Sequence, residues 1–364
     1  MKKTTLLIVS IFLFIGGVIP MLQASQFIPA NHPNIQYFGR WDQTDPLQPK
    51  HSWPGVYIIL KFTGTRIGIR MTDNVNYYNI SIDGKHQGII HGNQSEEADY
   101  SLADGLVNTE HTCRLSKRNT SFEQMFSISG FLLDDGAELL EPAPSPERKI
   151  EFLGNSFTAA EGNEATELEM EWTAKMPVTN IDLGFAPVIA RHFNAQYATT
   201  CRPGIGMAND WQGNLEMALP KRFDRALMDF QEPKWDFQKW IPDLVVIILG
   251  LNDYSGFGGW RGEVSAANSE LYRTKYHDFI TTIRNVYPDI KICAVAAHVP
   301  WIREQVKQVV KAEQVAGHID IFYAQFDEFE GGYVANGHPT VETHQKMADQ
   351  IIEVIEANKI FKSF

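Results

Sequence analysis

The sequence has few cysteines, no excess of basic residues and, beyond its first residues, no long apolar run. Its three cysteines, Cys113, Cys201 and Cys293, allow at most one intrachain disulfide, and their wide spacing matches no metal-binding pattern. The formal net charge of −12 argues against nucleic acid or an anionic membrane surface as a partner. Because no later segment is long and apolar enough to span a membrane, these absences point to a globular protein with an acidic, solvated surface.

The first residues have the features of an export signal. Lys2 and Lys3 form a charged start, residues 6–19 are apolar, and Gln23-Ala24-Ser25 offers a small-residue cleavage site. A membrane anchor is the alternative, but the apolar run is short and polar residues follow it at once. We therefore expect residues 1–25 to be a signal peptide. After cleavage we expect no stable membrane insertion, and a protein that is exported to the periplasm or secreted.

The length of 364 residues exceeds that of a typical single core and predicts two domains. Residues 26–141 contain short strand patterns separated by turns. Residues 57–62 and 66–71, for example, flank Thr63-Gly64-Thr65, which is a hairpin signal. Several short strands with regular turns predict a β-sandwich of the jelly-roll type for this first domain.

A proline-rich linker is expected at residues 142–148, because proline at that density stiffens the chain and cannot continue a sheet. Over residues 149–364, strand patterns alternate with helical patterns, which predicts an α/β domain with a mainly parallel sheet between helices. The expected strands cover residues 149–153, 195–200, 243–249, 290–296 and 319–323, and the expected helices cover 182–193, 268–286, 302–316 and 341–357.

Three polar residues whose side chains can take part in catalysis lie next to these elements. Ser156 comes directly after the first strand, at the carboxyl edge where open α/β sheets bind ligands. Asn252 follows a buried strand in the run Gly-Leu-Asn-Asp, and His338 precedes a proline and the last helix. An unactivated serine is a poor nucleophile, and it needs a base and donors for the oxyanion. His338 is the candidate base, and the Asn252 side-chain amide is a candidate donor.

Each of these segments also has an ordinary structural interpretation. Gly, Asn and Asp are common in turns, and a lone histidine at a helix start is usually structural. The turn with Gly204 and Gly206 offers backbone N–H groups, but a Gly-x-Gly pattern is weak by itself. His344 competes with His338 as a base, although its place inside a predicted helix favours a structural role.

The order of these motifs resembles that of the SGNH (GDSL-type) hydrolases, over residues 149–364. The motifs are, in chain order, Ser156, the Gly-x-Gly turn, Asn252 and the His338-Pro pair. The resemblance implies a flavodoxin-like, three-layer α/β/α domain with Ser156 as nucleophile and His338 as general base and acid. It also implies an oxyanion hole made by the N–H of Ser156, a glycine N–H from Gly204 or Gly206, and the Asn252 amide. It implies no metal and no organic cofactor.

The N-terminal part narrows the resemblance. A jelly roll ahead of an SGNH domain is similar to the family 2 carbohydrate esterases, which remove acetyl groups from plant polysaccharides. This implies an acetylated polysaccharide or oligosaccharide as the partner, and no nucleic acid. Sugar rings stack on aromatic faces, so aromatic side chains near the motifs are candidates for the substrate cleft, with core packing as the alternative. These residues are Trp211, Tyr254, Trp260 and Trp301.

Two positions depart from the SGNH pattern. The first motif usually reads Gly-Asp-Ser, and this chain has Asn155 before the serine. Many SGNH enzymes also carry an aspartate two or three residues before the histidine, where this chain has Asn336 and Ala335. The resemblance therefore implies a Ser-His dyad, with a backbone carbonyl or Asn336 orienting the imidazole. Carboxylates further upstream are the alternative, namely Asp327, Glu328 and Glu330.

The hypothesis from the sequence is a serine esterase that deacetylates xylan-type or mannan-type polysaccharides. Because the aspartate is missing and a β domain is present, an exported carbohydrate-binding protein with a weakened hydrolase site is an alternative. A lipid-directed esterase or acyl transferase of the same fold is a further alternative, although no long apolar lid segment lies near the motifs.

Overall fold

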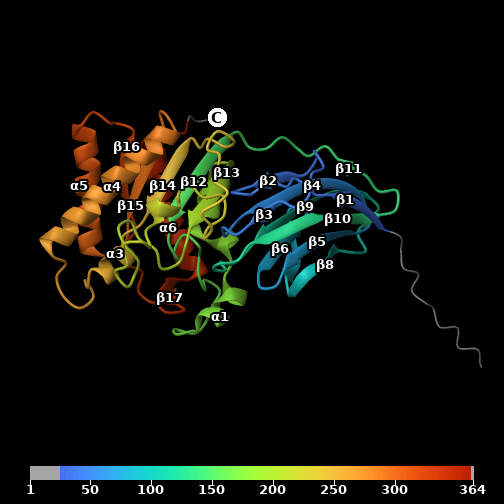
Figure 1. Cartoon of the computed structure of the whole chain (residues 1–364), viewed down its shortest axis with the longest axis horizontal. Helices are drawn as coiled ribbons and strands as arrows, with labels where there is room; N and C mark the ends of the chain where they lie inside the picture. Colours follow the sequence, from blue (N-terminus) through green and yellow to red (C-terminus); the bar gives the residue numbers. More distant parts are fainter. Residues whose placement is uncertain (1–24, 362–364) are drawn as a thin grey trace, which may run out of the picture.

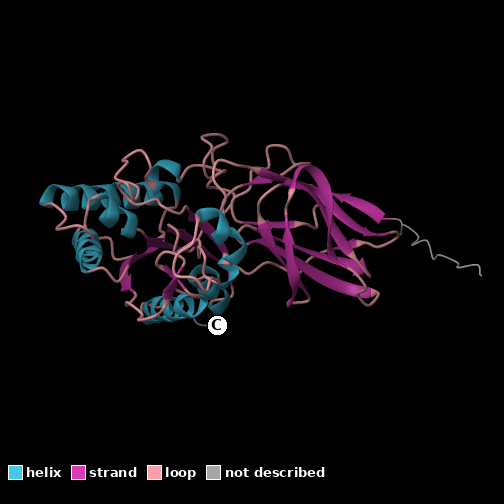
Figure 2. Ribbon diagram, turned by 90° about the horizontal axis from the view of Figure 1, so that it is seen from below, coloured by secondary structure: helices cyan, strands magenta, loops and turns pink. Residues whose placement is uncertain are grey.

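The computed structural model describes residues 25–361, so the expected signal peptide lies, apart from Ser25, outside the described residues. A β-rich half and an α/β half lie side by side along the long axis of the molecule (Figure 1). Every described helix belongs to the α/β half, and the other half consists of strands and loops (Figure 2). No helix within residues 25–361 has the length and apolar character needed to cross a membrane.

The β-rich half is a sandwich of two antiparallel sheets, as the sequence predicts. The strands of the first sheet are, in order, β1 (Ser25–Pro29), β10 (Phe126–Asp134), β5 (Ile67–Asp73) and β8 (Gln94–Ala103), and β3 (Lys50–His51) pairs with β10. The strands of the second sheet are, in order, β11 (Leu139–Leu140), β4 (Tyr57–Gly64), β9 (Thr109–Lys117), β6 (Tyr77–Ile82) and β7 (Lys85–His91), and β2 (Gln36–Phe38) pairs with β4.

Alternation of apolar and polar residues explains why these strands form a sandwich. In β5, Ile67, Ile69 and Met71 are buried, and the residues between them are half-buried. The side chains of a strand point to opposite faces in turn, so one face of each sheet can be apolar. The apolar faces of the two sheets supply one half of a continuous hydrophobic core.

The α/β half contains a five-stranded parallel sheet. The strands follow the order β13 (Ala195–Cys201), β12 (Arg148–Gly154), β14 (Leu244–Ile248), β15 (Lys291–Ala296) and β16 (Ile321–Gln325). This is the flavodoxin-like order, in which the chain moves first to one side of its opening strand and then to the other. The expected three-layer α/β fold is therefore confirmed, and the reversal of direction lies at β12, the strand that precedes Ser156.

The helices cover both faces of this sheet. α2 (Phe185–His192) packs on β12, β13 and α6 (Val341–Ala357), whereas α4 (Ala266–Val286) packs on α5 (Pro300–Val315), which packs on β15 and β16. Because crossovers between parallel strands are right-handed, the reversal at β12 sends α2 to one face and α4 and α5 to the other. Shorter elements complete this half: α1 (Trp172–Lys175), α3 (Leu251–Gly256), the 3₁₀ turns η1 (Met176–Val178), η2 (Ile181–Leu183) and η3 (Leu219–Arg222), and the strand pair β17 (Tyr333–Val334) and β18 (His338–Pro339).

The segment between the two halves is irregular from residue 141 to residue 147, and β12 begins at Arg148, inside the stretch expected to be a linker. The division of the chain at residues 142–148 stays a prediction, because buried residues of both halves belong to one continuous hydrophobic cluster. All three cysteines are buried free thiols, and burial raises the pKa of Cys113 and of Cys293 to about 12.

A buried ion pair joins the two halves at the first strand of the parallel sheet. Arg40 Nη2 lies 2.8 Å from Glu151 Oε1, with only 2% and 1% of the side chains exposed. Glu151 also accepts hydrogen bonds from the hydroxyl groups of Thr200, at 2.6 Å, and Tyr287, at 3.0 Å. Buried charges are tolerated when further hydrogen bonds satisfy them, and both oxygens of the Glu151 carboxylate accept such bonds here.

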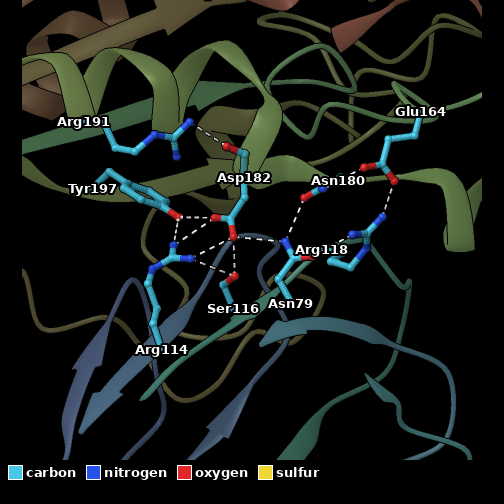
Figure 3. Close-up of polar contacts among 9 residues, drawn as sticks. All are labelled: Asn79, Arg114, Ser116, Arg118, Glu164, Asn180, Asp182, Arg191 and Tyr197. Atoms are coloured by element: carbon cyan, nitrogen blue, oxygen red, sulfur yellow. Dashed lines mark hydrogen bonds and ion pairs between the residues drawn. The ribbon is translucent and has the colours of Figure 1, made fainter. Parts of the chain in front are cut away.

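A second polar cluster crosses the same interface (Figure 3). Asp182, in η2, accepts two hydrogen bonds from Arg114 of β9 at 2.8 and 2.9 Å, and further ones from Tyr197 at 3.0 Å and Asn79 at 3.1 Å. Ser116 donates to the same carboxylate. Burial alone would raise the pKa of Asp182, but the charge and hydrogen bonds of Arg114 outweigh it and hold that pKa well below its usual range.

The cluster continues toward the loop that follows Ser156. Arg118 donates to Asn79 at 2.6 Å and forms an ion pair with Glu164, which also accepts from Asn180 at 2.8 Å. Arg191 of α2 donates to the backbone carbonyl of Asp182 at 2.8 Å. These contacts tie strands β6 and β9 of the sandwich to the first part of the α/β half (Figure 3).

Replacing Asp182 by asparagine should destabilise the protein at neutral pH by about 3 kcal/mol, because Arg114 would lose a counter-charge that is only 13% exposed and that it contacts through two hydrogen bonds. The folded-state pKa of Asp182 is lowered, so its contribution is present above the unfolded value near 4 and is lost as pH falls toward the folded value. The difference between wild type and Asp182→Asn, measured by urea unfolding, should therefore be largest near pH 7 and shrink below about pH 4.

Asp99→Asn is the matched control. Asp99 also pairs with an arginine, Arg70, at 2.6 Å, but both side chains are about a third or more exposed. An exposed pair contributes about 1 kcal/mol or less. Equal losses of stability in the two variants would contradict the role given to Asp182.

Candidate active site

Ser156 lies just beyond the end of β12, in a tight turn. Asn155 is buried, and its side-chain oxygen accepts a hydrogen bond from the N–H of Phe157 at 3.0 Å. Gly154 leaves no room for a side chain, because an added Cβ would lie 1.9 Å from the hydroxyl oxygen of Thr158. The turn therefore holds Ser156 at the carboxyl edge of the sheet, as expected from the sequence.

His338 lies in β18, and a backbone carbonyl fixes its ring. The distance from His338 Nδ1 to the carbonyl oxygen of Ala335 is 2.7 Å. A carbonyl can only accept, so Nδ1 carries the proton, and Nε2 of the neutral ring is left without one. Ala335, Asn336 and Gly337 have φ angles of +45°, +67° and +82°, so the chain turns back through the left-handed region and directs this carbonyl at the ring.

The proposed orienting role of the Asn336 side chain is wrong. Its Oδ1 accepts a hydrogen bond from the N–H of Met170 at 3.1 Å, while its own N–H donates to the carbonyl of Leu168 at 2.6 Å. Asn336 thus anchors the turn to the segment before α1. Of the upstream carboxylates, Asp327 pairs with Arg303 at 3.0 Å and does not serve His338.

His344 is a buried part of α6. Its Nδ1 accepts a hydrogen bond from the N–H of Phe185 at 3.4 Å, and burial lowers the pKa of His344 to about 3. A neutral ring with that environment supports packing between α6 and α2. The structural role favoured from the sequence is confirmed.

The Gly-Leu-Asn-Asp segment forms the start of α3. Asn252 donates through its side-chain amide to the carbonyl of Ile205 at 2.7 Å, which fixes the side chain and leaves its second N–H free. Asp253 is fully buried and accepts hydrogen bonds from the N–H groups of Met207 at 2.9 Å and Ala208 at 2.6 Å. Burial raises the pKa of Asp253 to about 6, although these N–H groups oppose the shift.

The two candidate glycines have different environments. Gly204 lines the cleft with a φ of +79°, and an added Cβ would lie 3.2 Å from Trp211. Gly206 does not line the cleft. It packs so closely on Asp253 that an added Cβ would lie 2.3 Å from the carboxylate. Gly204 is therefore the candidate oxyanion donor, and Gly206 allows the loop to dock on Asp253.

One cleft of about 770 Å³ brings most of these residues together. Among its lining residues are Ser156, Gly204, Trp211, Asn252 and His338. Trp211 is 55% exposed, so a large part of its ring is accessible to solvent. The sequence therefore predicted the members of this site that follow strand ends or precede the last helix.

The other three aromatic candidates do not line this cleft. Tyr254 contacts Trp260 and Trp301 with ring centroids 4.8 and 5.7 Å apart, and the Trp301 indole N–H donates to Ser269 at 3.0 Å. Tyr254 and Trp301 are partly buried and pack against the core, which was the alternative interpretation, whereas Trp260 is 61% exposed.

Several lining residues had no signal in the sequence. Phe122, from the β-rich half, stacks on Trp172 of α1 with centroids 4.5 Å apart, and the guanidinium of Arg202 lies 4.3 Å from the Phe122 ring. Glu161 and Lys175 form a buried ion pair at 2.9 Å in the same cleft. Within residues 25–361, no group of three His, Cys, Asp or Glu side chains is arranged to hold a metal ion.

Comparison with known proteins places the chain in a family. Residues 150–351 match the GDSL-like lipase/acylhydrolase family, and residues 37–144 match the carbohydrate esterase 2 N-terminal domain. The chain therefore belongs to the GDSL-like lipases and acylhydrolases, with the N-terminal domain type of carbohydrate esterase 2. Both expected resemblances are confirmed.

Individual relatives agree. The chain is 32% identical over 346 residues to the cellulase/esterase CelE of Acetivibrio thermocellus, and 28% identical over 211 residues to an acetylxylan esterase / glucomannan deacetylase of Cellvibrio japonicus. The matches cover 92% and 58% of this chain, but only 41% and 57% of those relatives. The structure of a family two carbohydrate esterase from Clostridium thermocellum in complex with cellohexaose aligns with a TM-score of 0.81 at 29% identity, over 89% of this chain and 98% of that chain. The structure of an active-site mutant of such an esterase from the same organism aligns with the same TM-score and identity, over 90% of this chain and 98% of that chain.

The close packing of Gly206 on Asp253 leads to a prediction about stability. Gly206→Ala should lower the free energy of unfolding by about 2 kcal/mol, because the new methyl group must displace the carboxylate or the carbonyl of Asn209, 2.5 Å away. Thermal or urea unfolding measures the loss. Gly262→Ala is the control, since a Cβ there meets nothing within 4 Å, and an equal loss in both variants would contradict the prediction.

Proposed function

We propose that this protein is a serine esterase that removes O-acetyl groups from plant polysaccharides of the xylan or mannan type. The observation that carries the proposal is the arrangement in the cleft. His338, with Nδ1 fixed by the Ala335 carbonyl, lines it together with Ser156 and Asn252. A nucleophile, an oriented base and an oxyanion donor are the parts that acyl transfer requires.

In the proposed first step, the Ser156 hydroxyl attacks the acetyl carbonyl and His338 Nε2 accepts its proton. The N–H groups of Ser156 and Gly204 and the free Asn252 amide N–H stabilise the negative oxygen of the tetrahedral intermediate. Collapse releases the sugar hydroxyl, which receives the proton from His338, and leaves an acetyl group on Ser156.

In the second step, water attacks the acetyl-enzyme with His338 again as the base, and acetate and free Ser156 result. These steps need no metal and no organic cofactor. A neutral carbonyl fixes the tautomer of His338 but stabilises the imidazolium less than a carboxylate would. The site we propose is a dyad of Ser156 and His338.

Substrate and location are part of the proposal. An acetylxylan esterase / glucomannan deacetylase among the relatives, and a related esterase solved with cellohexaose, support a polysaccharide substrate. The exposed Trp211 and the stacked Phe122 and Trp172 offer aromatic faces for sugar rings. Export by the N-terminal signal would bring the enzyme to such a substrate.

The test is acetate release from acetylated xylan and glucomannan. Ser156→Ala should lose about 10³-fold or more of the turnover, because no other group in the dyad supplies a nucleophile. Ser255→Ala is the matched control, since Ser255 lies in α3 but does not line the cleft. Turnover by Ser156→Ala near the wild-type rate would refute the assignment.

Asn252→Ala should lower kcat by about 10²-fold to 10³-fold with little change in KM, because its amide contacts the oxyanion and not the ground-state ester. Steady-state kinetics with 4-nitrophenyl acetate separate the two parameters. A change confined to KM would remove Asn252 from the oxyanion hole and make it a substrate-binding residue.

A carbohydrate-binding role with a weakened hydrolase site is the second candidate, favoured by the missing carboxylate at His338 Nδ1. Affinity electrophoresis on soluble polysaccharides, run beside the acetate assay, distinguishes the two. Retention without acetate release would favour binding.

A further inference from the structure

The cleft contains a buried ion pair that the proposed steps leave unused. Lys175 Nζ donates to Glu161 Oε1 at 2.9 Å, and the two side chains are 9% and 7% exposed. The other carboxylate oxygen, Glu161 Oε2, lies 3.9 Å from His338 Nε2. Because Nδ1 is bonded to the Ala335 carbonyl, the negative charge of Glu161 faces the nitrogen that takes up the proton in the proposed reaction.

The backbone holds Glu161 in this place. Its N–H donates to the carbonyl of Ser156 at 3.1 Å, so nucleophile and carboxylate belong to one turn. The residues on either side, Ala160 and Gly162, have φ angles of +52° and +64°. Thr179 links both ends of the ion pair, since its hydroxyl accepts from the N–H of Gly162 and donates to the carbonyl of Lys175, each at 2.8 Å. A non-glycine residue at positive φ is costly and persists where surrounding contacts require it.

We propose that Glu161 is a positioning residue for the dyad, supplying from the Nε2 side of His338 the negative charge that the Nδ1 side lacks, and that Lys175 holds and partly neutralises it. This rests on the proposed esterase function. An opposite charge within about 4–6 Å favours the charged form of a titrating group, so the carboxylate stabilises the imidazolium formed when Ser156 gives up its proton. Orientation and charge stabilisation would then come from different groups.

The other polar groups around His338 do not duplicate this charge. His344 of α6 is held neutral by burial, and Asn336 carries no charge. Arg202 and Asp210 also line the cleft, but Arg202 is paired with Asp229 at 2.7 Å. Asp210 accepts from backbone N–H groups in its own loop, each at 2.9 Å. Glu161 and Lys175 are thus the charged groups on which the pH dependence of the dyad should depend.

The test is the pH profile of kcat/KM for 4-nitrophenyl acetate. In Glu161→Gln the acid limb should move to lower pH, because the imidazolium loses a stabilising charge, and kcat/KM on the plateau should fall about tenfold. In Lys175→Met the acid limb should move to higher pH, because the carboxylate loses its counter-charge. Glu161→Asp keeps the charge and should lie nearer to wild type than Glu161→Gln.

Glu164→Gln is the matched control. Glu164 lies three residues further along the same loop and is also ion-paired, with Arg118, but it does not line the cleft. Its replacement should leave the acid limb unmoved, whatever it does to stability. A purely structural role for Glu161 would lower activity equally at every pH.

The outcomes separate this proposal from the esterase assignment. If Ser156→Ala abolishes turnover and Glu161→Gln leaves the acid limb unmoved, the role of Glu161 is refuted and the esterase stands. If Ser156→Ala keeps its turnover, the esterase assignment fails first. Should Glu161→Gln fail to fold at the assay temperature, Lys175→Met decides, since an unmoved limb in that variant also refutes the proposal.

Discussion

The buried ion pair between Arg40 and Glu151 is the contact on which the geometry of the molecule depends. Arg40 comes from the β-rich half, and Glu151 lies in β12, the strand that leads into Ser156. Moving two charges out of water costs several kcal/mol each, so the pair is stable only because both ions find further partners. Glu151 finds them in Thr200 of the neighbouring strand and in Tyr287 beyond α4, and Arg40 lies close to aromatic rings and donates to a backbone carbonyl. A strand tied to three separate parts of the protein leaves its carboxyl end little freedom.

A fixed interface also explains why the cleft belongs to both halves. The contacts of Asp182 and Glu164 hold strands β6 and β9 against the loops that follow Ser156. Phe122, a few residues beyond β9, thereby reaches Trp172 and Arg202 at the wall of the cleft. The β-rich half therefore contributes a residue to the lining of the cleft. An aromatic wall built across two halves can keep its shape only where the halves do not move apart, which the buried ionic contacts oppose.

The sequence predicted the parts of the site that depend on topology. Ser156 and Asn252 follow parallel strands, whose carboxyl ends meet at one edge, and the order of the motifs defines the rest. It left open whether a backbone carbonyl or Asn336 orients His338, because nothing in the sequence shows which carbonyl faces the ring. Ala335 and Asn336 adopt positive φ without being glycine, and the bonds to Glu167 and Leu168 that require it join segments far apart in the chain. Phe122 and Glu161 were missed as well. An aromatic residue in a loop and a glutamate in a turn ordinarily lie on a surface, and the contacts that bring these two to the cleft join segments far apart in the chain.

The turn at Ala335 directs a backbone carbonyl at His338, close to where the SGNH pattern has an aspartate. An aspartate near the histidine has two physical effects, because it fixes the ring and it places a negative charge beside it. The Ala335 carbonyl provides the first effect at 2.7 Å and carries only a dipole for the second. Its position is nevertheless well defined, because the N–H groups of Ala335 and Asn336 bond to the segment before α1, and the methyl group of Ala335 packs where Gly162 has no side chain. The Ser156 loop and the His338 turn therefore contact each other directly, so backbone packing sets the spacing between Ser156 and His338.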